Sequence, residues 1–234
     1  MLSAAVVSGG LATRLRPLTA TTPKSLLPIN GEPFITHQLR LLRVNRIEHV
    51  VLCVGYLGEM IQQSVGDGSS FGLCVDYSFD GERMLGTAGA VKKAISKLGE
   101  MFFVLYGDSY LPCDYGAVAA AFKATTKLAL MTVFKNSDMW DASNVEFEDG
   151  KLIDYHKKRR SSRMHYIDYG LGVFRSEAFA TVPSDRPADL ADLYRDLLMR
   201  GELIGFEVRE RFYEVGSIKG LQDTADYLAH RGDR

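Results

Sequence analysis

Two adjacent glycines follow the first apolar run of the chain, and two cationic side chains come shortly after them. The run at residues 4–7 leads into Gly9 and Gly10, and Arg14 and Lys24 follow. Adjacent glycines after a parallel strand let backbone N–H groups approach a polyphosphate that a Cβ would obstruct. Neither the GxGxxG fingerprint nor the Gly-Lys-Ser/Thr end of a Walker loop is present. The pattern predicts a polyphosphate site, and a tight surface turn is the alternative for the glycines alone.

An aspartate stands at the end of the most apolar segment. Residues 101–106 read MFFVLY, and Gly107 and Asp108 follow directly. An acid placed just after a buried parallel strand lies at the carboxyl edge of the sheet, where ligands bind in open α/β folds. Because Mg²⁺ prefers carboxylate, phosphate and water oxygens, Asp108 is a candidate metal ligand. A strand-end turn or a helix cap is the alternative.

The composition limits which classes of partner the chain can have. It has 234 residues, of which 46% are hydrophobic and 24% charged, with a formal net charge of -1. This length predicts one domain, residues 1–234. A net charge this small offers no general attraction to nucleic acid or to an anionic membrane, so we expect neither as a partner. A homo-oligomer is left open.

Cysteine usage and the N-terminus indicate the compartment. The three cysteines are scattered without CxxC spacing, which argues against a disulfide framework or a zinc cluster. No basic region followed by a signal-type apolar core opens the chain, and no apolar stretch reaches the roughly 18–20 residues of a membrane span. We therefore expect a cytoplasmic protein.

Strand-like and helix-like stretches alternate through the first half of the chain. The predicted strands are residues 4–7, 49–54, 73–77 and 101–106, and the predicted helices are residues 34–44, 58–65 and 88–98. Continuous apolar strands separated by helices indicate a parallel sheet that is covered on both faces.

The second half has more strands and fewer helices. Its predicted strands are residues 128–134, 144–147, 151–155, 166–174 and 203–208, and its predicted helices are residues 190–199 and 218–229. This pattern predicts an antiparallel extension of the same sheet rather than a second domain. Ser217 is a candidate N-cap for the last helix.

Four motifs together resemble a known family. Residues 8–28 resemble the signature of the sugar-1-phosphate nucleotidyltransferases, GGxGTRLxPLTxxxPKxLLP, with Ala12 where the family usually has Gly. Residues 85–90 (LGTAGA) look like the family's second nucleotide-contacting turn, and Gly107-Asp108 matches its metal aspartate. Residues 212–217 (FYEVGS) resemble its W-x-D-(I/V)-G-T element. The motifs span nearly the whole chain in the family's order.

The resemblance implies a fold and a nucleotide site. The fold is a Rossmann-like nucleotidyltransferase fold of the α/β class, with a mixed, mainly parallel central sheet, helices on both faces and no C-terminal β-helix domain. The residues implied to bind the nucleotide belong to the two glycine turns: Ser8, Gly9, Gly10, Thr13, Gly86 and Thr87.

The resemblance also implies a reaction. An oxygen of a sugar 1-phosphate attacks the α-phosphorus of a nucleoside triphosphate, and pyrophosphate leaves. Positioning and charge neutralisation carry such a step without a covalent nucleophile. Arg14 then binds the β- and γ-phosphates, and Lys24 stabilises the α-phosphoryl group. Mg²⁺ is held by Asp108 and by Glu214, which stands where the family normally has Asp.

The motifs that bind the sugar phosphate and the sugar in the family are matched less closely by this sequence. The family's sugar-phosphate lysine lies in an EKP element, and counting from Gly150 favours Lys158, with Lys157 close behind. A solvated basic loop is the alternative. Asn144 and Gly170 occupy positions of sugar-contacting turns, although ordinary strand-end roles are equally compatible. Trp140 is expected either to flank the sugar or to pack in the core.

The base and the sugar are inferred from the second turn. Met84 stands where relatives that read uracil or thymine often have Gln, and LGTAGA resembles mannose-1-phosphate and D-glycero-D-manno-heptose-1-phosphate guanylyltransferases. This favours GTP and a manno-configured hexose or heptose. Uridylyl or thymidylyl transfer to another sugar stays open. A nucleotide-sugar-sensing subunit without activity is disfavoured because Arg14, Lys24 and Asp108 are all present.

Overall fold

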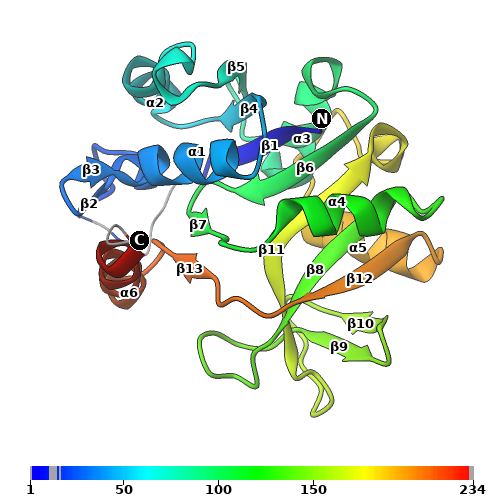
Figure 1. Ribbon diagram of the computed structural model, residues 1–234. Helices are drawn as coiled ribbons and strands as arrows, with labels where there is room; N and C mark the ends of the chain where they lie inside the picture. The colour runs from blue at the N-terminus through cyan, green and yellow to red at the C-terminus, as the bar shows by residue number, and fades with distance from the viewer. Residues whose placement is uncertain (1, 11–14, 16, 232–234) are drawn as a thin grey trace.

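The chain folds around one large mixed sheet, and helices pack on both faces of this sheet (Figure 1). The computed structural model describes residues 2–10, 15 and 17–231. Its longest sheet path is β10-β9-β11-β6-β1-β4-β5, with β8 joined to β11 and β12 joined to β8. The α/β class and the mixed sheet predicted from the sequence are confirmed.

Four parallel strands form the half of the sheet that the first part of the chain supplies. They are β1 (Ser3–Ser8), β4 (His49–Val54), β5 (Cys74–Phe79) and β6 (Met101–Tyr106). In β4, Val50 and Leu52 enter one hydrophobic cluster while Val51 and Cys53 enter another on the opposite face. Since successive side chains point to opposite faces, a strand with both sets buried must be covered on both sides.

The helices supply that cover. The cluster containing Val50 receives α1 (Phe34–Val44), α2 (Gly58–Val65) and α4 (Tyr115–Lys123). The cluster containing Val51 receives α3 (Gly86–Leu98) and α5 (Leu190–Met199). The sequence pattern did not predict α4. Its stretch YGAVAAAFK carries small and apolar residues on every side, so it shows no clear helical periodicity.

The other half of the sheet is organised around one long strand. It contains β8 (Ala129–Lys135), β9 (Val145–Glu148), β10 (Lys151–Tyr155), β11 (Tyr166–Arg175) and β12 (Leu203–Val208). β11 pairs antiparallel with β6, β8 and β9, as the sequence predicted. The expectation is wrong for β12, which pairs parallel with β8. β12 begins opposite Ala129, the first residue of β8, and runs in the direction of β8 along its side away from β11.

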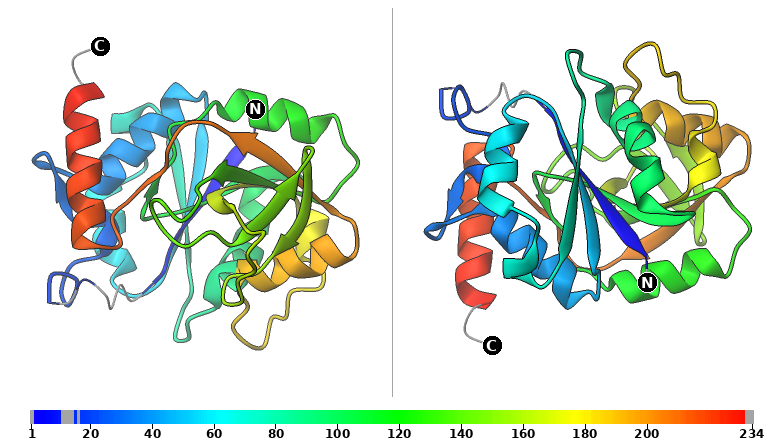
Figure 2. Two further views of the ribbon diagram at one scale, coloured as in Figure 1. Left: turned by 90° about the horizontal axis from the view of Figure 1, so that it is seen from below. Right: turned by 90° about the horizontal axis from the view of Figure 1, so that it is seen from above.

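A third group of elements lies at one end of the molecule. It contains the hairpin β2 (Pro28–Ile29) and β3 (Glu32–Pro33), the two-strand ladder of β7 (Ser109–Tyr110) and β13 (Tyr213–Glu214), and α6 (Ile218–Arg231). Figure 2 shows α6 and α5 at opposite ends of the molecule in both views. Ser217 caps α6 as predicted, since its Oγ accepts from the Gly220 N–H at 2.9 Å.

Short turns of 3-10 helix in the described part of the chain are η2 (Lys24–Leu26), η3 (Ser69–Phe71) and η4 (Ser176–Phe179). No helix within the described ranges is long and apolar enough to span a bilayer.

Candidate active site

Two adjoining cavities open at the carboxyl ends of the central strands. The smaller, about 260 Å³, is called here the β1 cavity, and it is lined by Val7, Ser8, Gly10, Pro23, Lys24, Ser25, Thr87, Tyr106, Gly107, Asp108 and Lys157. The larger, about 490 Å³, is called the β11 cavity. Its walls include Tyr106, Asp108, Trp140, Asn144, Lys157, Asp168, Gly170, Phe212 and Glu214. Three residues line both: Tyr106, Asp108 and Lys157.

Close approach of the backbone shapes the β1 cavity. The Gly107 N–H donates to the Val7 carbonyl at 2.9 Å, and a Cβ on Gly107 would collide with the Ser8 side chain. Among the described residues, nothing lies within 4 Å of the position that a Cβ on Gly10 would take. The ends of β1 and β6 therefore meet tightly at Gly107.

A lysine and an aspartate pair across the β1 cavity. Lys24 Nζ lies 2.7 Å from Asp108 Oδ2, and the two side chains are 23% and 35% exposed. Lys24 begins η2, whose turn is closed by the Leu26 N–H donating to the Pro23 carbonyl at 2.9 Å. A cation held beside a carboxylate at a strand end can neutralise an incoming phosphoryl group or release the carboxylate to a metal.

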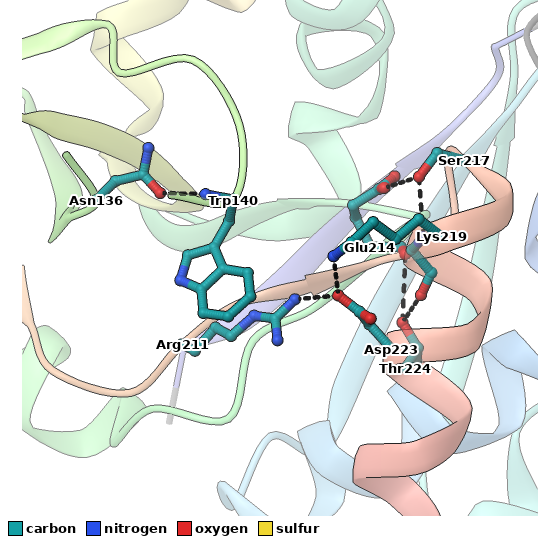
Figure 3. Close-up of polar contacts among 9 residues, drawn as sticks. Asn136, Trp140, Arg211, Glu214, Ser217, Lys219, Asp223 and Thr224 are labelled. Atoms are coloured by element: carbon teal, nitrogen blue, oxygen red, sulfur yellow. Dashed lines mark hydrogen bonds and ion pairs between the residues drawn. The ribbon is translucent and has the colours of Figure 1, made fainter. Parts of the chain in front are cut away.

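The β7–β13 ladder brings Glu214 to the same edge as Asp108. Glu214 lies opposite Ser109, and the Val215 N–H donates to the Asp108 carbonyl at 2.9 Å. The Glu214 carboxylate accepts from the Gly216 N–H and from Ser217 Oγ, the latter at 2.7 Å (Figure 3). Both carboxylates line the β11 cavity. Two carboxylates on one wall suit Mg²⁺, which takes its remaining ligands from phosphate and water.

The predicted nucleotide residues divide into two groups. Ser8, Gly10 and Thr87 line the β1 cavity. Gly9 and Gly86 instead pack against backbone: a Cβ on Gly9 would lie 3.4 Å from the Gly55 nitrogen, and one on Gly86 (φ +73°) would collide with residue 188. Thr13 and the predicted phosphate-binding Arg14 lie outside the described residues.

The Thr87 hydroxyl is engaged within the protein. It donates to Asp189 Oδ1 at 2.6 Å and accepts from the Leu190 N–H at 2.7 Å, which ties the start of α3 to the start of α5. The other oxygen of Asp189 lies 3.6 Å from Lys157 Nζ. The Thr87 hydroxyl and Lys157 together hold the pKa of Asp189 below its ordinary value against the effect of burial. Asp189 thus fixes Lys157 beside both cavities, a role the sequence pattern did not indicate.

Two neighbouring lysines differ in position. Lys157 lines both cavities, whereas Lys158 lines neither of them and is exposed. The Lys158 N–H donates to His156 Nδ1 at 3.1 Å in the turn that follows β10. The count from Gly150 favoured Lys158, but the structure places Lys157 at the cavities.

A bulge in β11 presents polar groups to the β11 cavity. The strand register shifts between Asp168 and Gly172, and Gly170 has φ +97° there. Asp168 Oδ1 accepts from the Gly170 N–H at 3.0 Å, and Asn144 Oδ1 accepts from the Asp168 N–H at 2.9 Å. Burial raises the pKa of Asp168 to about 6. Asn144 Nδ2 donates to no other residue of the described part, so it can serve a ligand hydroxyl.

Asp80 lies beside the glycine turn, although it lines neither cavity, and the sequence pattern did not single it out. It is 9% exposed, and its Oδ2 accepts from the Leu85 N–H at 3.2 Å. That oxygen lies 3.3 Å from the position of a Cβ on Gly9. Burial raises its pKa. The signal in the sequence is weak: Asp80 follows β5 (CVDYSF) directly, as Asp108 follows β6, but β5 is not a continuous apolar run. Met84, on the turn between Asp80 and α3, is 43% exposed.

Comparison with known proteins agrees with this geometry. A family model described as nucleotidyl transferase matches residues 3–230. A mannose-1-phosphate guanylyltransferase from Mycobacterium tuberculosis is 26% identical, over 100% of this chain and 69% of the relative. An N-acetylmuramate alpha-1-phosphate uridylyltransferase from Neisseria meningitidis is 28% identical, over 95% of this chain and 96% of the relative.

Among solved structures, HddC from Yersinia pseudotuberculosis complexed with GMP-PN matches with a TM-score of 0.82 at 21% identity. The match covers 97% of this chain and 100% of HddC. At this identity the likeness shows that the two chains share a fold.

Proposed function

The chain belongs to the nucleotidyl transferase family, and from that premise we propose that it transfers guanylate from GTP to a manno-configured hexose or heptose 1-phosphate. The broader activity, a sugar-1-phosphate nucleotidyltransferase, rests on the family match and on relatives that act on several bases and sugars. The observation that carries it in the structure is the Lys24–Asp108 pair between a glycine turn and a second, polar cavity.

The two cavities suggest how the substrates are placed. The β1 cavity, with its glycine turn and Lys24, receives the triphosphate, and the β11 cavity receives the sugar. Lys157 borders both and is suited to hold the sugar phosphate facing the α-phosphorus. Holding two anions in line lowers the barrier through orientation and neutralised charge.

The reaction then follows from these positions. An oxygen of the sugar phosphate attacks the α-phosphorus, the bond to the β-phosphate breaks, and pyrophosphate carries away the leaving charge. Lys24 stabilises the charge on the α-phosphoryl oxygens, and Arg14 is proposed for the β- and γ-phosphates. Asp108 and Glu214 would hold Mg²⁺, which supplies charge neutralisation to the phosphoryl oxygens when bound.

Asp80 supports the preference for guanine. A carboxylate only accepts hydrogen bonds, and the guanine edge offers N1–H and N2–H₂ as adjacent donors. Uracil and thymine place one N–H between two carbonyls, and a carboxylate would face at least one of those oxygens unfavourably. Asp80 packs on Gly9, next to the cavity residues Ser8 and Gly10. The guanylyltransferase relative and the guanine nucleotide bound to HddC point the same way.

A substrate panel tests the proposal. Pyrophosphate release is measured with GTP, ATP, UTP, CTP and dTTP against mannose, glucose, N-acetylmuramate and heptose 1-phosphates. We expect GTP to exceed UTP and dTTP at least about tenfold in kcat/KM, which corresponds to about 1.4 kcal/mol. Asp80→Asn should reduce that preference, and Met84→Gln should narrow it by offering an amide to a pyrimidine. Preference of the wild type for UTP would refute guanylyl transfer and favour the activity of the Neisseria relative.

A further inference from the structure

Trp140 is exposed at the edge of the β11 cavity instead of packing in the core. It is the single tryptophan of the chain and is 39% exposed. It stands in residues 136–144, which connect β8 with β9, and it borders both the β11 cavity and a smaller cavity of about 60 Å³. Of the two roles that the sequence leaves open, core packing is excluded by this position.

Polar side chains hold the backbone around Trp140, and two of them, Asn136 and Ser143, are buried. Asn136 is 1% exposed, and its Nδ2 donates to the Asp141 carbonyl at 2.6 Å and to Ser143 Oγ at 3.1 Å. Asn136 Oδ1 accepts from the Trp140 N–H at 3.2 Å. Asp138 Oδ1 accepts from the Ser143 N–H at 2.7 Å. The segment therefore fixes the position of Trp140 without burying its indole.

An arginine supports the indole from a distant part of the chain. The Arg211 guanidinium carbon lies 3.4 Å from the centre of the indole ring (Figure 3). Arg211 Nη2 forms an ion pair with Asp223 of α6 at 2.5 Å, and the guanidinium also lies 4.7 Å from the Tyr213 ring. A cation placed over an indole attracts its π face, so this contact holds the ring in one orientation.

Two features of this contact disfavour the folded state. Arg211 Nε is buried and has no hydrogen-bond partner among the described residues, which is a cost to the folded state. An indole left partly exposed also forgoes apolar burial. The result is a flat apolar surface, supported on one side by Arg211, on the wall of a cavity that also holds Asn144 and Asp168.

We propose that Trp140 is a specificity-determining wall of the sugar site, against which the apolar C–H face of the pyranose ring packs. Arg211 and Asp223 are positioning residues that orient the indole. A pyranose ring has hydroxyls at its rim and C–H groups on its faces. A sugar site therefore needs polar partners for the hydroxyls and an aromatic surface for the C–H groups. This inference rests on the proposed function, since it takes the β11 cavity as the sugar site.

The single tryptophan permits a direct binding test. Tryptophan fluorescence of the wild type is titrated with mannose 1-phosphate, and with each other sugar 1-phosphate of the panel, in the presence of Mg²⁺ and a non-hydrolysable GTP analogue. We expect a saturable change whose midpoint follows the KM for that sugar, and a smaller change with the GTP analogue alone. Turnover of a sugar that leaves the fluorescence unchanged would overturn the inference and leave the proposed function intact.

The opposite outcome separates the two proposals as well. A saturable fluorescence response to a sugar 1-phosphate, without pyrophosphate release from any substrate pair, would support the role of Trp140 and refute the proposed activity. Absence of both would overturn both.

Variants distinguish the loss of a contact with the sugar from the loss of the folded structure. Trp140→Ala should raise the KM for the sugar 1-phosphate about tenfold and leave the KM for the nucleotide unchanged, and Trp140→Phe should restore most of the loss. Arg211→Met should raise the same KM less. Arg200→Ala is the matched control, because Arg200 also forms an ion pair with an aspartate, Asp196 at 3.1 Å, and lines neither of the cavities that Trp140 borders. Equal changes in both KM values for Trp140→Ala would contradict the assignment, and thermal unfolding shows whether each variant is folded.

Discussion

The two cavities are built by different means. Of the eleven described residues that line the β1 cavity, six lie at or just after the ends of β1 and β6, neighbouring parallel strands whose register brings Val7 opposite Tyr106. The β11 cavity takes its wall from loops and strand ends spread between Tyr106 and Ser217. Backbone pairing therefore sets the shape of the first, and side-chain contacts between distant segments set the shape of the second.

The cavities also differ in charge. Three carboxylates of the β11 cavity (Asp141, Asp168 and Glu214) do not reach the β1 cavity, while Lys24 lines only the β1 cavity. Such a difference suits a triphosphate on one side and sugar hydroxyls on the other. Substitutions in the β1 cavity should accordingly lower kcat, and substitutions in the β11 cavity should raise the KM for the sugar 1-phosphate.

The largest effect is expected at Asp108, which borders both cavities. Asp108→Asn keeps the shape but removes the proposed Mg²⁺ carboxylate, so turnover should fall close to background, as it should for the wild type in EDTA. Pyrophosphate release across a Mg²⁺ titration measures this. Near-normal activity with unchanged Mg²⁺ dependence would remove Asp108 from the metal site.

Lys24→Ala should be next in size. Loss of a charge that acts on the transition state lowers kcat about 10²-fold or more, roughly 3 kcal/mol, with little change in either KM. Steady-state kinetics with both substrates varied provide the measurement. A rise in KM alone would show that Lys24 binds the ground state.

The two neighbouring lysines sharpen the comparison. Lys157→Ala should raise the KM for the sugar 1-phosphate about tenfold, because a hydrogen bond to a charged group contributes about 1.5–3 kcal/mol. Lys158→Ala, the matched control, should change it little. Asp189→Asn should reproduce part of the Lys157 effect by weakening the 3.6 Å pair. A larger rise in this KM for Lys158→Ala than for Lys157→Ala would assign the sugar phosphate to Lys158.

The smallest effect concerns pH. Because burial raises the pKa of Asp168 to about 6, its carboxylate is the main form above that pH and the neutral acid is the main form below it. As an acceptor for sugar hydroxyls, it should bind more weakly as pH falls through about 6, raising the KM for the sugar about threefold. The sugar phosphate titrates in the same range, so Asp168→Asn serves as the reference profile. Identical profiles would exclude Asp168 from the site.

The sequence alone determined most elements and several residues that line the β1 cavity. The bounds of α1, β4, α2, β6 and α5 agree with the predicted ranges. Apolar periodicity, caps and glycine turns act between residues close in the chain, so they can be read locally. Ser8, Gly10, Lys24 and Asp108 follow from that reading, because the ends of neighbouring parallel strands meet at one edge.

The tertiary structure alone decided which residues line the β11 cavity. Lys157, and not Lys158, lines both cavities, where it pairs with Asp189, which in turn bonds to Thr87. The Trp140 indole is contacted by Arg211, whose partner Asp223 lies on α6. These contacts join segments far apart in the chain, and their geometry follows from how α5, α6 and the β7–β13 ladder pack against the sheet. No local pattern records such distances, since each partner alone is an ordinary charged or aromatic residue on a loop or at a helix end.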